Sequence, residues 1–109
     1  MSGPGGGSFG SGIPAADVAC ELLEFNTQIS SPKASVIAHI QVGDVLSLSA
    51  EQQGPAQVLV IRRGADVAGG ITSPRMARLI ECILLGTKYQ VAVTEKSGGQ
   101  VSIRVSPVI

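Results

Sequence analysis

Apolar and polar side chains alternate residue by residue along this chain, and that pattern constrains its fold more than any other feature. The alternation is clearest from Leu23 to Ile29, from Tyr89 to Thr94 and from Val101 to Ser106. Successive side chains of a β-strand point to opposite faces, so each stretch predicts a strand that is buried on one side. Three further strands are predicted over Val45 to Ser49, Gln57 to Arg63 and Asp66 to Ile71.

Two segments carry the spacing of helices instead. Apolar side chains recur three and four residues apart at Met76, Leu79, Ile80, Ile83 and Leu84. Because this spacing places them on one helix face, the segment predicts an amphipathic helix that begins after Ser73-Pro74 and ends at Gly86. Ser31-Pro32 gives the same start signal, an N-cap residue followed by proline, for a short helix through about His39.

Turn residues predict how the strands are connected. A two-residue turn at Gly64-Ala65 is expected to pair Arg63 with Asp66. The large apolar residues of the last two strands all have odd numbers, so pairing them requires that the two residue numbers of each pair sum to an even value. A loop with an odd number of residues meets this condition, which predicts the three-residue loop Ser97 to Gly99. Glu51 to Ala56 is predicted as a polar loop because it combines polar residues with Gly-Pro.

These elements predict a mainly β (β-rich α+β) domain over residues 18–109. We expect a small six-stranded antiparallel β-barrel with one short helix and one longer covering helix, and an open α+β sheet is the alternative. Residues 1–17 are rich in glycine and serine. They offer few apolar side chains to offset the entropy of ordering, so they are predicted to be a disordered tail.

Cysteine and histidine are scarce, which limits metal and redox chemistry. Cys20, Cys82 and the single histidine, His39, cannot supply the four ligands of a structural zinc site. We expect both thiols to be free in a cytoplasmic, reducing compartment, and a disulfide between them is the alternative. No cofactor, metal or catalytic residue is expected, because His39 has no carboxylate near it in the sequence.

Charge is balanced, with 8 Lys and Arg against 8 Asp and Glu. The chain therefore lacks the overall positive field of a general nucleic-acid or membrane-surface binder. Its apolar runs, such as Val58 to Ile61, are far shorter than a membrane span. Any anion site must be a local patch, and the candidate phosphate ligands are Arg62, Arg63, Ser73, Arg75, Arg78, Lys88 and Arg104.

The order of segments between Val42 and Val93 carries a resemblance. It consists of Val42-Gly43-Asp44-Val45-Leu46, an apolar strand, Val67-Ala68-Gly69-Gly70-Ile71, an amphipathic helix, Gly86 and Tyr89-Gln90-Val91-Ala92-Val93. This order resembles the small β-barrel of the HIRAN family, although Gln53-Gly54-Pro55-Ala56-Gln57 stands where that family carries an Asn-Pro-Tyr-Asp-like run. Known members bind DNA ends as modules attached to helicases and nucleases, so the resemblance implies a nucleic-acid-binding barrel. Cys20 to Thr27 is also similar to small bacterial proteins.

Two functions of different classes follow. The first is a non-enzymatic accessory domain that docks a protein partner through an exposed strand edge or its helix surface. The second is a HIRAN-like module whose basic residues contact the phosphates of nucleic acid. An enzyme would instead need His39 or a cysteine beside an acid in a pocket.

Overall fold

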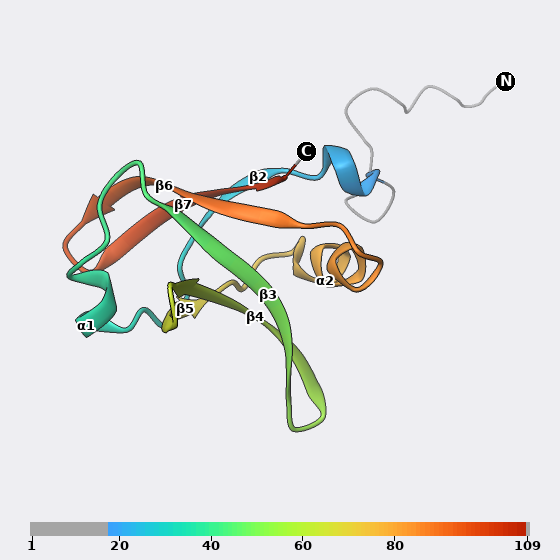
Figure 1. Ribbon diagram of the computed structural model, residues 1–109, viewed down its shortest axis with the longest axis horizontal. Coiled ribbons are helices and arrows are strands. Elements are labelled where there is room, and N and C mark those ends of the chain that lie inside the picture. The colour runs from blue at the N-terminus through green and yellow to red at the C-terminus, as the bar shows by residue number, and fades with distance from the viewer. Residues whose placement is uncertain (1–17, 109) are drawn as a thin grey trace, which may run out of the picture.

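The computed structural model describes residues 18–108 as one antiparallel sheet with two α-helices beside it (Figure 1). In spatial order the strands are β2 (Phe25–Gln28), β7 (Gln100–Pro107), β6 (Tyr89–Ser97), β3 (Val45–Gln53), β4 (Ala56–Arg63) and β5 (Asp66–Gly70). The helices are α1 (Ala34–Ile37) and α2 (Met76–Leu84), and a 3-10 turn (Cys20–Leu22) precedes β2. The predicted mainly β fold with six antiparallel strands is confirmed, whereas the predicted tail over residues 1–17 lies outside the described residues.

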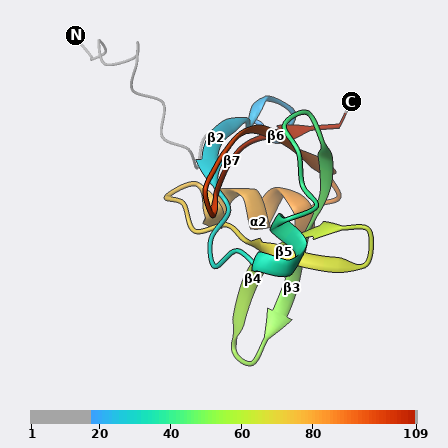
Figure 2. The same ribbon diagram turned by 90° about the vertical axis from the view of Figure 1, so that its left-hand side faces the viewer.

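The sheet curves around α2 but does not close (Figure 2). The segment after β2 meets β5 at one bridge, where Ser30 N–H donates to Gly70 O (2.8 Å) and Gly70 N–H donates to Ser30 O (2.9 Å), and Lys33 N–H donates to Ala68 O (2.9 Å) nearby. A Cβ on Gly69 would lie 2.6 Å from the Ser30 carbonyl oxygen, so glycine permits this close approach. Because one bridge is not a strand ladder, the predicted barrel is not confirmed, and the fold is an open, curved sheet.

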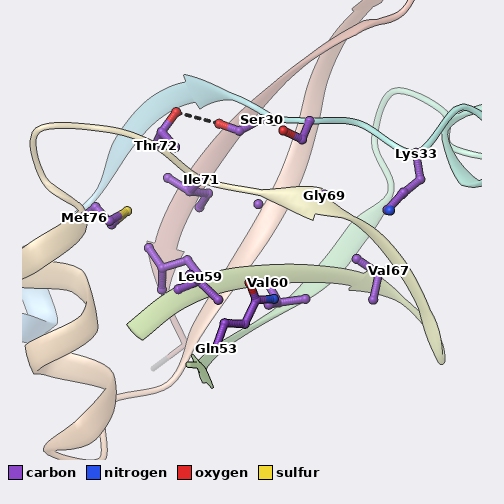
Figure 3. A pocket seen from close by; sticks show the side chains of 13 residues that line it. Ser30, Lys33, Gln53, Leu59, Val60, Val67, Gly69, Ile71, Thr72 and Met76 are labelled. Atoms are coloured by element: carbon purple, nitrogen blue, oxygen red, sulfur yellow. Dashed lines mark hydrogen bonds between the residues drawn. The ribbon is translucent and has the colours of Figure 1, made fainter. Parts of the chain in front are cut away.

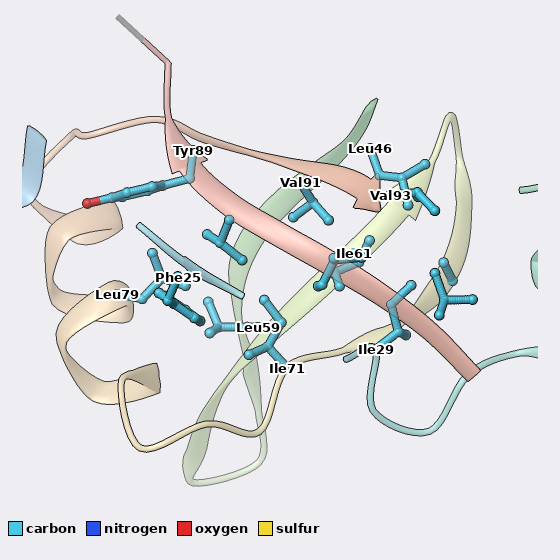
Figure 4. Close-up of a cluster of buried hydrophobic side chains, with 14 of the residues drawn as sticks. Phe25, Ile29, Leu46, Leu59, Ile61, Ile71, Leu79, Tyr89, Val91 and Val93 are labelled. Carbon is cyan, nitrogen blue, oxygen red and sulfur yellow. The ribbon is translucent and has the colours of Figure 1, made fainter. Parts of the chain in front are cut away.

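The alternating strands enclose an apolar core (Figure 4). The inward residues of β6 and β7 are at most 5% exposed, namely Tyr89, Val91, Val93, Val101, Ile103 and Val105. Leu79 of α2 packs into the same cluster, so α2 covers the core as predicted. Leu84, by contrast, is 64% exposed. It lies two residues beyond the buried Cys82 and therefore on the opposite side of the helix.

The β6–β7 turn differs from the prediction. Ser97 pairs with Gln100, so the turn is the two-residue Gly98-Gly99 and not a three-residue loop. The register shifts between Val93 and Glu95, where a bulge adds one residue to β6. Because of this extra residue, Val93 pairs with Ile103, and the residue numbers of the pairs from Tyr89 to Val93 sum to an even value. The apolar residues of both strands therefore share one face, as expected.

Residues 51–56 are not a loop, as predicted, but the end of a hairpin. β3 runs to Gln53, and the two-residue turn Gly54-Pro55 leads directly into Ala56 of β4. Gly54 has a φ of +58°, a left-handed conformation that glycine adopts without strain. The polar residues that suggest a loop are solvent-exposed because the hairpin projects beyond the sheet (Figures 1 and 2).

The helices start later than predicted. Their N-cap positions are Lys33 and Arg75 rather than Ser31 and Ser73. Ser73 Oγ instead accepts a hydrogen bond from the Arg75 N–H (3.2 Å), which closes a turn before α2. α2 ends as predicted, because Gly86 after it has a left-handed φ of +106°.

The two cysteines form a disulfide, so the expectation of free thiols is wrong. The Cα atoms of Cys20 and Cys82 lie 5.5 Å apart, within the range of a disulfide, although 62 positions separate them in sequence. The Tyr89 hydroxyl donates a hydrogen bond to Cys20 O (2.6 Å) and holds the same segment from β6. Burial raises the pKa of Tyr89, so its hydroxyl remains a donor at neutral pH.

Candidate functional site

The β3–β4 hairpin leaves two strand edges without partners. β3 pairs with β6 only from Val45 to Ser47, and β4 pairs with β5 only from Val60 onward. Between these limits, the chain from Leu48 to Leu59 is a ribbon of two strands, and we call it the β3–β4 ribbon. No strand within residues 18–108 covers either edge of the ribbon. Unpaired edges of this kind are templates for pairing with another chain.

Hydrogen-bond direction alternates along an antiparallel strand, which identifies the free backbone groups. Val93 N–H donates to Asp44 O (2.9 Å), so even-numbered residues of β3 point toward the β6 side. Gly70 bonds to Ser30, so Val60, which lies opposite Gly70 on β4, is oriented toward β3. By this alternation, the outward N–H and C=O groups of the ribbon belong to Leu48, Ala50, Gln52, Gln57 and Leu59. Leu48 and Leu59 adjoin the ends of the two ladders, and a Cβ on Gly70 would lie 2.8 Å from the Leu59 carbonyl oxygen, so the free groups are those of Ala50, Gln52 and Gln57.

A groove of about 310 Å³ lies over β4 and β5 and reaches the segment from Ser30 to Lys33 beside β5, and we call it the β4 groove (Figure 3). Its apolar lining comes from Val58, Leu59, Val60, Val67, Ile71 and Met76. The hydroxyls of Ser30 and Thr72 lie 2.7 Å apart beside it. Among the residues that the structure describes, Lys33 is the only charged one in the lining, and Figure 3 shows it on the Ser30 side, across from Val67.

A second groove, of about 470 Å³, runs along the free edge of β3, and we call it the β3 groove. Leu48 and Ala50 line it from the strand, while Ile83, Lys88 and Tyr89 line it from α2 and β6. It offers fewer apolar side chains than the β4 groove. The two free edges of the ribbon therefore face two different surfaces.

One face of the hairpin carries an ion pair. Arg62 binds both carboxylate oxygens of Glu51, and the Ser49 hydroxyl donates to the same carboxylate (3.0 Å). The hydrogen bond from Arg62, and secondarily that from Ser49, holds the pKa of Glu51 below its usual value. The same contact with Glu51 raises the pKa of Arg62. Because the pair is solvent-exposed, it adds little stability, but it neutralises one predicted phosphate ligand.

Two of the other predicted phosphate ligands converge on one residue. Arg104 forms an ion pair with the Glu24 carboxylate. Arg75 contacts the Glu24 carbonyl oxygen (3.4 Å) and lies over the Phe25 ring, 5.7 Å from its centroid. Their meeting point therefore already contains an acidic side chain.

The remaining predicted ligands lie on separate elements. Arg78 pairs with Glu81, as the helical spacing predicts, and also donates to Val18 O (2.9 Å). Arg63 lies opposite Asp66 across the β4–β5 turn, as predicted. Lys88 lines the β3 groove, and Ser73 closes the turn before α2.

His39, the candidate base, is exposed and follows α1. Both cysteines are consumed by the disulfide. Within residues 18–108, no group of three or more His, Cys, Asp or Glu side chains is placed to hold a metal ion. None of the helices in that same range combines the length and the apolar character needed to cross a membrane.

Sequence reasoning misses both grooves, because they depend on where the strand ladders stop. The signal that could have found the ribbon is Gly54-Pro55, two turn residues directly between strand-forming segments. Lys33 and Val67 belong to no local motif, and only the fold brings them to one groove.

Comparison of the chain with protein-family models, with curated proteins and with solved structures finds no match. Its function must therefore be argued from the geometry of the site. That geometry consists of two free strand edges, each beside a groove lined by apolar side chains and one lysine.

Proposed function

We propose that this chain is a non-enzymatic docking domain that accepts an extended segment of a partner protein on a free edge of the β3–β4 ribbon. The observation that carries the proposal is that both strand ladders stop short of the ribbon. An extended segment placed there would add a strand, receiving main-chain hydrogen bonds from the edge and side-chain contacts from the groove.

The ribbon suits this role because its own pairing does not depend on the partner. Every residue from Ser47 to Gln53 has a partner on β4, so the hairpin is formed before a segment docks. A preformed edge lowers the entropic cost of binding. The proposal also gives a reason why a hairpin with polar side chains extends beyond the apolar core.

The site of action follows from the disulfide. The expectation of a cytoplasmic location depends on free thiols, and Cys20 and Cys82 are bonded to each other. Structural disulfides persist mainly in oxidising compartments. We therefore propose that the domain works in an oxidising compartment. Trapping of thiols in cells that produce the protein tests this, and free thiols there would instead support the cytoplasm.

The docking function is tested with a displayed library of short linear peptides selected on the full chain. Amide hydrogen exchange then maps the bound peptides. We expect the peptides to slow exchange at outward amides of the ribbon, such as those of Ala50 or Gln57. The proposal would be contradicted if no peptide were selected. It would also be contradicted if the peptides slowed amide exchange only in α2 or only around Arg75 and Arg104.

Two edge variants complete this test. Gln57→Pro removes an outward N–H from β4, and Gln52→Pro removes one from β3, while both spare the backbone hydrogen bonds between the two strands. Each also removes the hydrogen bond that Gln57 Nε2 donates to Gln52 Oε1 (2.7 Å), so this loss is common to the two variants. Binding that depends on a strand edge should be weakened by one of them. Peptides that tolerate both substitutions would not be adding a strand to the ribbon.

The HIRAN-like alternative, binding of nucleic-acid phosphates, is favoured by one observation, the approach of Arg75 and Arg104 to a common point at Glu24. We rank it second because that point contains a carboxylate. Titration with short single-stranded and duplex DNA across salt concentrations tests it. Salt-dependent affinity that is lost in Arg75→Gln would support it, and the absence of such affinity would reject it.

A further inference from the structure

We propose that the β4 groove, rather than the β3 groove, is the docking site, and that it selects a segment with small apolar side chains and one acidic side chain that pairs with Lys33. This inference rests on the proposed docking function. It adds the edge that is used and the chemistry of the partner segment.

The backbone of the groove offers the first element of recognition. The outward N–H and C=O of Gln57 lie on the free edge of β4, next to Val58 of the groove lining, and Gln57 is exposed. β5 does not cover this position, because its ladder ends at Gly70 opposite Val60. A docked segment that aligns with Gln57 would extend the sheet beside β4.

The lining of the groove offers the second element. Val58, Val67 and Met76 are half-buried, so each presents apolar surface that a partner can still cover. Leu59 and Ile71 lie below them and are only 2% exposed. A volume of about 310 Å³ is at the lower end for ligand sites, so small side chains such as those of alanine and valine suit it. The unbranched Met76 side chain can adjust to their shape.

The charge of the groove offers the third element. Lys33 is exposed, and within residues 18–108 no carboxylate lies within ion-pair distance of it. Its backbone is nevertheless fixed, because its N–H donates to Ala68 O of β5 (2.9 Å). A cation anchored beside an apolar groove complements an acidic side chain on the docked segment.

The β3 groove also has one lysine, Lys88, so charge alone does not separate the two sites. The apolar lining does. The β4 groove is lined by six apolar residues, whereas the β3 groove is lined by four, namely Leu48, Ala50, Ile83 and Tyr89. Part of the β3 groove is bordered by the polar loop at Thr87. The β4 groove therefore provides more of the apolar contact that stabilises a docked side chain.

The experiment uses the displayed peptides selected on the full chain and compares three charge reversals of equal size. We expect the selected peptides to share an acidic residue at a fixed position and to bind Lys33→Glu about tenfold more weakly. Arg63→Glu is the matched control, because Arg63 is exposed at the β4–β5 turn and lines neither groove. Affinity for this control should stay within about twofold of the unmodified chain.

Lys88→Glu separates this inference from the docking function itself. If the acidic preference is lost in Lys88→Glu and kept in Lys33→Glu, the β3 groove is the site and this inference is overturned, while the docking function stands. Peptides that protect the Gln57 amide but share no acidic residue also overturn it. Peptides that protect neither edge overturn the docking function as well. A switch from acidic to basic residues when the library is selected on Lys33→Glu would confirm the pairing.

Discussion

The β6–β7 pair and the β3–β4 ribbon are both antiparallel hairpins with two-residue turns, yet they differ in what surrounds them. β6 and β7 each have a strand on both sides, and their inward residues are at most 5% exposed. Beyond Ser47, β3 pairs with β4 alone, and its residues there are half-buried or exposed. Pairing on both sides makes a strand part of the core, whereas pairing on one side leaves its edge available for recognition.

The comparison also separates stability from function. The packed region consists of the core cluster, α2 and the disulfide that joins α2 to the segment before β2. The ribbon contributes Leu59 to that cluster, with Leu48 and Ala50 packed against it, but its remaining residues lie outside the cluster and it carries both free edges. Changes in the packed region should therefore alter unfolding, while changes in the ribbon should alter binding.

Reduction of the Cys20–Cys82 disulfide acts on the packed region and should have the largest effect. Loss of a link across 62 residues of sequence frees loop entropy in the unfolded chain, so the free energy of unfolding should fall by about 4 kcal/mol. Urea unfolding with and without reductant measures the change. The chain has only these two cysteines, so the reductant acts on one bond. An unchanged midpoint would show that the disulfide does not support this region.

Matched truncations compare the two hairpins directly. Ile103 is 0% exposed, so Ile103→Ala should lower the free energy of unfolding by about 3 kcal/mol. Val58 on the ribbon is half-buried, so Val58→Ala should cost about 1 kcal/mol or less. Chemical unfolding of both variants measures the difference. Equal losses would remove the distinction between core and ribbon.

Gly69→Ala probes the contact between the ends of the open sheet. The added Cβ would meet the Ser30 carbonyl at a backbone φ of +157°, so we expect a loss of about 2 kcal/mol. Thermal unfolding and the exchange rate of the Ser30 amide measure it. Gly99→Ala is the control, because open space surrounds that position and its φ is ordinary. Similar losses in both variants would mean that the Ser30–Gly70 bridge has no special role.

The Glu51–Arg62 pair should give the smallest effect. Because the folded pKa of Glu51 lies below the usual 4.5, the stabilisation is present above 4.5 and is lost as pH falls through the lowered pKa. Arg62→Gln should return the Glu51 pKa toward the usual value, as measured by NMR titration of the carboxyl. If the Glu51 pKa is the same in Arg62→Gln as in the unmodified chain, Arg62 is not the cause of the lowered pKa. The substitution should not impair peptide binding at the β4 edge.

Side-chain periodicity predicts the packed region well and the candidate site poorly. The residues facing the core on β6 and β7 follow directly from alternation, because each strand is buried on one side. The register does not follow, because the bulge between Val93 and Glu95 leaves no local signal. Tertiary structure determines where the strand ladders end. It also determines that Lys33 lies in the β4 groove and that Cys20 is bonded to Cys82. Such contacts join residues that are far apart in sequence, so no local pattern contains them.

Amide hydrogen exchange along the β3–β4 ribbon of the unbound protein tests most directly whether the edges of the ribbon are free. We expect alternation: slow exchange at Ser49, Glu51 and Val58, whose N–H groups point to the opposite strand, and fast exchange at Ala50 and Gln57, whose N–H groups point outward. Uniform slow exchange at all five amides would mean that both edges are already covered, and it would contradict the claim that the ribbon is open for docking.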